Sequence, residues 1–225
     1  MIHYHGTPIT GVGVLGRLAG RCFCVSHARP EQVTVCHEIG QSVMLDNGAF
    51  SLWRSGTQTD WPAYYTWCEH WLQHQTTWAV IPDIIDGTGD DNDALIRRWP
   101  HGQRGAPVWH MHEPIDRLLR LAEHWPRVCL GSSGAYATIG DGRWHYRTDA
   151  AMNALCGNSP VPVWLHMLRG MALSGSEYPF ASVDSTDVAQ NHRRPHNDAL
   201  RMALRWDAKQ CPPAWTHREQ LELTG

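Results

Sequence analysis

Four aspartates stand at or just beyond the ends of short apolar runs, where carboxylates can be held for chemistry. They are Asp46, Asp83 and Asp184, in the runs 42–46, 78–83 and 180–185, and Asp187 one turn later. Two carboxyl groups whose environments separate their pKa values can act as acid and nucleophile on a glycosidic bond. A lone aspartate of this kind often caps a turn, but several of them predict a shared acidic site.

The turn after Asp46 has two interpretations. Asn47-Gly48 is a strong signal for a two-residue β-hairpin. The alternative is a tight turn from a barrel strand into its helix, in which small residues let the backbone come close to a flat ligand. The elements that surround this turn decide between the two interpretations.

Eight short apolar runs alternate with segments of helical pattern. The apolar runs are 2–6, 21–28, 42–46, 78–83, 107–113, 127–133, 161–168 and 180–185. The clearest helical segments are 60–75, 89–100, 113–125, 146–157 with Gly157 as its cap, and 196–207, and 29–40 is the best of the less clear ones. This alternation predicts parallel βαβ units, and eight of them in 225 residues predict an α/β fold, a single-domain (β/α)8 TIM barrel over residues 1–225. An open doubly wound sheet is the alternative, and the polar tail 212–225 is expected to fray.

Composition limits the function classes. A net charge of −3 argues against a general basic surface for nucleic acid, and the local basic clusters are Arg97-Arg98 and 191–196. No apolar run approaches the ~18 residues of a membrane span, and the N-terminus lacks the pattern of a signal peptide. Seven scattered cysteines without a C-x-x-C pair predict reduced thiols in a cytoplasmic protein.

Four segments, in order along the chain, resemble the tRNA-guanine transglycosylase (queuine tRNA-ribosyltransferase) superfamily. LDNGAFS at 45–51 is similar to its D-S-G-G-[FY]-Q, and VIPD at 80–83 to its apolar strand that ends in a base-reading Asp. LGSSGAYA at 130–137 is similar to G-G-[LF]-[AS]-x-G-E, and SVDSTDVAQNHR at 182–193 to V-D-x-F-D-C-x-x-P-T-R. The chain looks most like the short phage and bacterial branch of this superfamily, which handles 7-deazaguanines.

The resemblance implies a pentosyltransferase that exchanges a guanine or 7-deazaguanine base in nucleic acid through a covalent Asp–sugar intermediate. Asp46 would be the general acid or base. The gapless match places the nucleophile on Asp187, with Asp184 as the alternative because it ends its strand more plainly. Asp83 would read the N1 and amino edge of the base.

The remaining substrate contacts are carried over in the same way. They are His112 in place of a base-contacting Gln, Ser132, Ser133 and Gly134 at the base carbonyl, Asn47 and Gly48 in the turn, and Arg193 at the T-R arginine. The family's C-terminal zinc site is absent because only Cys211 lies there, so no cofactor is expected. DNA and tRNA are the expected partners, a free nucleoside stays open, and the superfamily often forms homodimers.

Two rival interpretations remain. His3-x-His5 and His110-x-His112 lie on predicted strands, where alternate residues share a face, and with His166 and Asp184 they imitate a metal-dependent amidohydrolase. No bridging lysine stands at the end of the fourth strand, and the Asp46 turn would have no role. The third interpretation is a barrel that binds a nucleobase or nucleic acid without catalysis. Cys22, Cys24 and Cys36 are read as buried thiols rather than metal ligands.

Overall fold

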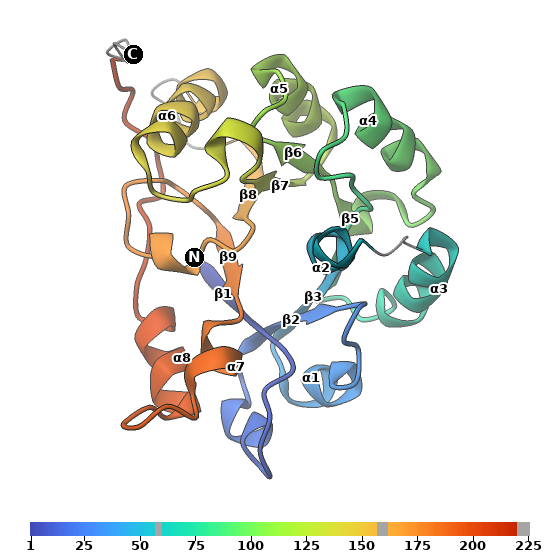
Figure 1. Ribbon diagram of the computed structural model, residues 1–225, viewed down its shortest axis with the longest axis vertical. Helices are drawn as coiled ribbons and strands as arrows, with labels where there is room; N and C mark the ends of the chain where they lie inside the picture. The colour runs from blue at the N-terminus through green and yellow to red at the C-terminus, as the bar shows by residue number, and fades with distance from the viewer. Residues whose placement is uncertain (57–59, 157–161, 220–225) are drawn as a thin grey trace.

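The computed structural model, which describes residues 1–56, 60–156 and 162–219, contains one sheet of parallel strands (Figure 1). The strands are β1 (Ile2–Gly6), β2 (Cys22–Ser26), β3 (Ser42–Asp46), β4 (Thr77–Val80), β5 (Gly105–Ala106), β6 (Val108–His110), β7 (Arg127–Gly131), β8 (Trp164–Met167) and β9 (Ser182–Ser185). Every apolar run of the sequence therefore contains a strand. Because β3 pairs in parallel with β2 and β4, the turn after Asp46 is not a hairpin.

The sheet closes on itself at the segment 105–110. The strand order runs β5-β4-β3-β2-β1-β9-β8-β7-β6, so the two ends of the sheet are consecutive in the sequence. Pro107, which has no N–H to donate, separates β5 from β6, and its carbonyl accepts a hydrogen bond from Cys129 N at 2.9 Å. The first half of this divided fifth strand pairs with β4 and the second with β7. The (β/α)8 prediction is confirmed, and the open doubly wound sheet is wrong.

Helices surround the barrel, with one exception at its mouth (Figure 1). The helices are α1 (Val33–Ile39), α2 (Ala49–Ser55), α3 (Trp61–Trp71), α4 (Gly89–Arg98), α5 (Ile115–His124), α6 (Gly142–Cys156), α7 (Asp187–Asn191) and α8 (Ala199–Asp207). The helix α2 lies inside the ring, next to the end of β3. Caps set the starts of the longer helices: Asp60 accepts from Ala63 N at 3.0 Å, and Thr88 forms a capping box with Asp91. Gly157 lies outside the described residues.

Alternation along each strand separates the barrel interior from the core beneath the helices. The interior cluster consists of Tyr4, Cys24, Met44, Trp78, Val80, Ala106, Val108 and Cys129. The intervening residues pack outward in two clusters, one around Phe23, Val25 and Leu45 and one around Trp109, Leu130 and Val183. The interior is therefore filled below the mouth, and the cavity described below opens at the end where the strands terminate.

The C-terminal segment is docked rather than frayed over 212–219. Trp215 is 3% exposed, its ring stacks on Tyr178 with centroids 5.6 Å apart, and its Nε1 donates to Asn153 Oδ1 at 2.8 Å. Arg218 N donates to the same oxygen at 3.1 Å. The expectation of a frayed tail is wrong for this part of it, and 220–225 lie outside the described residues. In the described chain, no helix has the length and apolar character needed to cross a bilayer.

Candidate active site

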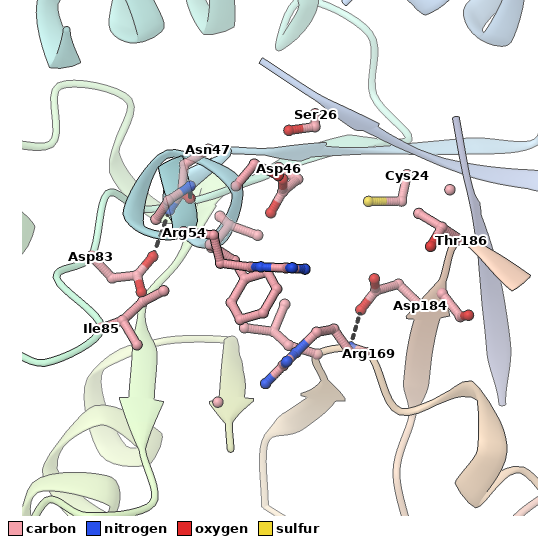
Figure 2. A pocket seen from close by; sticks show the side chains of 18 of the residues that line it. Cys24, Ser26, Asp46, Asn47, Arg54, Asp83, Ile85, Arg169, Asp184 and Thr186 are labelled. Carbon is pink, nitrogen blue, oxygen red and sulfur yellow. Dashed lines mark hydrogen bonds between the residues drawn. The ribbon is translucent and has the colours of Figure 1, made fainter. Parts of the chain in front are cut away.

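A cavity of about 750 Å³ opens at the C-terminal ends of the strands (Figure 2). Aspartates from three strand ends line it, namely Asp46, Asp83 and Asp184, and so do Asn47 and Ser132. This end of the barrel is where such folds hold their catalytic groups. The structure therefore brings together five of the residues that the sequence predicted.

Asp46 is a carboxyl group of the cavity wall with a raised pKa. It closes β3, and its Oδ2 accepts the Gly48 N–H at 3.1 Å. Burial raises its pKa to about 6, with Asp184 and Asp83 adding to the rise, while the nearby Ser26 hydroxyl and the Gly48 N–H oppose it. A carboxyl group with such a pKa can both donate and accept a proton near neutral pH.

Gly48 allows the chain to turn directly after Asp46. Its φ of 75° lies in the left-handed region that favours glycine, and its N–H points back to the Asp46 carboxylate. A Cβ at this position would lie 3.2 Å from the Ala28 side chain. Gly48 therefore positions Asp46 and is not itself part of the cavity wall.

Asp83 is fixed by two partners across the mouth. Asn47 Nδ2 donates to its Oδ1 at 2.7 Å, and His110 Nε2 lies 2.9 Å from its Oδ2. Asn47 Nδ2 also donates to Ile81 O at 2.9 Å, so this amide group hydrogen-bonds within the protein. Asn47 therefore orients Asp83, which lines the cavity.

Asp184 lies on the opposite side, on β9, and its side chain is 14% exposed. Its Oδ1 accepts the backbone N–H of Arg169 at 2.7 Å and lies 3.3 Å from His166 Nε2. His166 Nδ1 in turn lies 2.8 Å from Ser182 Oγ, which accepts from Trp164 Nε1 at 2.7 Å. If Ser182 donates its proton to Nδ1, Nε2 carries the proton that points at Asp184.

Asp187 does not reach the cavity. It is the first residue of α7, and its carboxylate accepts from Asn191 Nδ2 at 2.7 Å and from Trp206 Nε1 at 2.9 Å. It ties α7 to α8. Of the two nucleophile candidates that the sequence left open, only Asp184 faces the cavity.

Several predicted binding residues lie behind or beside the cavity wall. His112 is exposed, with Nδ1 2.7 Å from Ser133 Oγ and Nε2 3.1 Å from Gly87 O. Ser133 is thereby directed away from the cavity, and Gly134 begins the turn after it. Ser132 remains in the wall, with its Oγ accepting from Trp144 Nε1 at 2.9 Å. Arg193 is exposed beyond α7 and is not among the lining residues.

The carried-over base contacts did not include three charged or polar lining residues, of which His110 had been considered only as a metal ligand. His110, not His112, is the inward residue of its strand because β6 ends there and Glu113 N turns back to His110 O at 2.8 Å. Arg54 on α2 and Arg169 after β8 also reach the cavity. The rule that strand ends carry function, applied to the run 161–168, would have indicated Arg169.

The rival metal-hydrolase interpretation required His3 and His5 to face the barrel interior. Both point outward instead, toward α8, where His5 Nε2 lies 3.0 Å and His3 Nδ1 3.7 Å from Asp207 Oδ1. The ligand set of that interpretation is therefore not assembled. Among the described residues, no three His, Cys, Asp or Glu side chains are grouped so that they could hold a metal ion. All seven cysteines, which fall within this part of the chain, are free thiols.

Comparison with known proteins adds no identity. No family model matches the chain, and neither a curated protein nor a solved structure gives a significant match. The resemblance to the transglycosylase superfamily stays a prediction.

Proposed function

We propose that this protein is a pentosyltransferase that exchanges a guanine-type base in a nucleotide through a covalent Asp184–sugar intermediate. One observation carries the proposal: three strand-end carboxylates share one cavity, and their surroundings differ. Asp46 has a pKa of about 6, whereas Asp184 is held by N–H donors. A proton-carrying acid and an ionised carboxylate are the two groups that retaining glycosyl transfer needs.

In the first step, Asp184 Oδ attacks C1′ of the pentose, and the bond from C1′ to the base breaks. The departing base takes the proton of Asp46, which leaves Asp46 ionised. In the second step, Asp46 removes the proton from the incoming base, whose nitrogen attacks C1′ and expels Asp184. Two displacements at C1′ divide one difficult substitution and retain its configuration.

Asp83 supplies the contact that recognises the base. A carboxylate accepts two N–H donors side by side, which fits the N1–H and amino edge of guanine. Asn47 and His110 hold Asp83 from behind, so the orientation of this contact is set before the base arrives. A base within a duplex would have to leave its stack to reach a cavity at the end of a barrel.

The proposal is tested by incubating the protein with radiolabelled guanine or 7-deazaguanine and either tRNA or duplex DNA. We expect label to enter one polymer with the wild-type chain and to be absent with Asp184→Ala and Asp46→Asn. If neither polymer is labelled although guanine binds, the protein is a binding barrel without exchange chemistry. If exchange continues in Asp184→Ala, the assignment of the nucleophile is wrong.

A further inference from the structure

The backbone of Arg169 adopts an uncommon conformation beside the reacting carboxylate. Its φ is 58°, a left-handed value that is unfavourable for a residue with a side chain. Its N–H donates to Asp184 Oδ1 at 2.7 Å, which helps to hold this conformation. The same conformation carries the Arg169 side chain into the cavity.

Two guanidinium groups of the cavity wall have neutral groups as their direct contacts. Arg169 stacks over the Phe50 ring at 4.3 Å from its centroid and donates to Ser132 O at 3.2 Å. Arg54 stands 5.9 Å from the same ring. These partners are neutral, and no carboxylate of the described residues makes an ion pair with either side chain. Arg29, the third arginine of the cavity wall, is already paired with Glu31 at 2.9 Å.

Burial lowers the pKa of Arg169 and the charge of nearby Asp184 opposes this effect, although among the described residues no direct ion pair joins the two guanidinium groups to the three aspartates of the cavity. Asp46, Asp83 and Asp184 are engaged by N–H groups from Gly48, Asn47 and Arg169 rather than by the guanidinium groups. Figure 2 shows Arg54 and Arg169 in the space between Asp83 and Asp184. Two guanidinium groups that face one cavity repel each other unless an anion lies between them, and their fork of donors suits phosphate oxygens.

We propose that Arg54 and Arg169 form an anion clamp that selects substrates bearing a phosphate on the pentose. The proposal rests on the proposed function for the identity of the ligand, because Asp184 fixes where C1′ lies. Arg169 contacts Asp184 through its backbone and the phosphate through its side chain. It therefore couples the position of the phosphate to that of the reacting carboxylate. A free nucleoside lacks the group that the clamp binds.

The test is titration calorimetry of the full chain with guanosine and with guanosine 5′-monophosphate, without an incoming base. We expect the phosphate to improve the affinity at least about tenfold. The double variant Arg54→Gln/Arg169→Gln should bring the ratio near one, whereas Arg97→Gln, an exposed arginine of α4 outside the cavity, should leave it unchanged. Equal affinities in the wild type, or a ratio kept by the double variant, overturn the clamp.

Two further measurements distinguish failure of the clamp from failure of the proposed function. Arg169→Gly removes the guanidinium and also relieves the left-handed backbone, so it should fold by circular dichroism and still lose the phosphate preference. Inorganic phosphate tests the clamp without a base. If guanosine and its monophosphate both fail to bind, the proposed function is wrong, and loss of phosphate binding in the double variant still supports the clamp. No phosphate binding to the wild type then overturns the clamp as well.

The source of the phosphate is decided by a single-stranded pentadeoxynucleotide with one central guanine. Tighter binding than the monophosphate, lost in the double variant, supports the clamp and identifies a polynucleotide as substrate. Binding no tighter than the monophosphate, with the preference over guanosine retained, supports the clamp with a free nucleotide as substrate.

Discussion

At the scale of single residues, the site depends on how differently similar carboxyl groups are treated. Asp46, Asp83 and Asp184 share one cavity but have different partners: a glycine N–H, an asparagine with a histidine, and a backbone N–H with a histidine. Burial raises the pKa of Asp46 and so favours its protonated form. Their roles in the proposed reaction follow from these surroundings.

Because the pKa of Asp46 is raised in the folded state, the contribution of this residue to the free energy of unfolding depends on pH. The folded carboxyl titrates at about 6 and the unfolded one near ~3.9, so between these values the folded state holds the extra proton and stability falls as pH rises. Asp46→Asn cannot titrate. We therefore expect it to be about 1–3 kcal/mol more stable than the wild type at pH 8, with the difference gone below pH ~4.

Urea denaturation of both proteins at pH 4 and pH 8 measures this difference. An equal change in unfolding free energy at the two pH values would contradict the raised pKa. The same variant should have lost base exchange at either pH because its amide can neither donate the proton nor take it back.

His166 is a positioning residue for Asp184. His166→Gln breaks the chain from Ser182 to the carboxylate, and we expect kcat to fall about tenfold to a hundredfold while KM changes little. Steady-state kinetics separates the two parameters, and His124→Gln, an exposed histidine of α5, is the control. A raised KM with unchanged kcat would place His166 in substrate binding instead.

At the scale of elements, the strands and their ends were predictable, but the direction of side chains beyond them was not. The alternation of apolar runs gave all eight barrel strands, although the fifth is divided at Pro107. Whether a polar residue enters the cavity depends on where pairing stops. β9 ends at Ser185, so Asp184 faces inward and Asp187 begins a helix; β6 ends at His110, so His112 is already in the turn.

We therefore expect Asp187 to stabilise the contact between α7 and α8 and to have no role in base exchange. Asp187→Ala removes the acceptor of Trp206 Nε1 and Asn191 Nδ2, and we expect it to lower the free energy of unfolding by about 1–3 kcal/mol. Thermal unfolding and exchange assays below the transition test both statements. Loss of exchange in the folded Asp187→Ala protein would show that the gapless motif, rather than the cavity geometry, marks the nucleophile.

At the scale of the whole molecule, composition favoured one barrel but could not show how its C-terminal segment packs. The segment 212–219 reads as a polar tail, yet Trp215 is buried against Tyr178. Such a contact joins residues far apart in the sequence, so no local sequence pattern predicts it. The strand-end rule could have indicated Arg169, but not its left-handed backbone or the hydrogen bond from its N–H to Asp184 on another strand.

Trp215 is expected to stabilise the whole barrel. Trp215→Ala empties the space beside Tyr178 and removes the bond to Asn153, at a cost of about 3–5 kcal/mol. Chemical denaturation measures the loss of unfolding free energy. Trp53→Ala, the same substitution at an exposed position on α2, is the control. Equal stability of Trp215→Ala and the wild type would mean that the segment is not docked in solution.

The central claim is that Asp184 becomes covalently linked to the sugar, and acid quenching followed by peptide mass spectrometry tests it most directly. The protein is mixed with a guanine-containing polynucleotide, quenched within one turnover and digested with a nuclease and a protease. The account predicts a pentose-containing adduct on the peptide that carries Asp184, located to that side chain by fragmentation. An adduct on Asp187, or active base exchange with no adduct on Asp184, would contradict it.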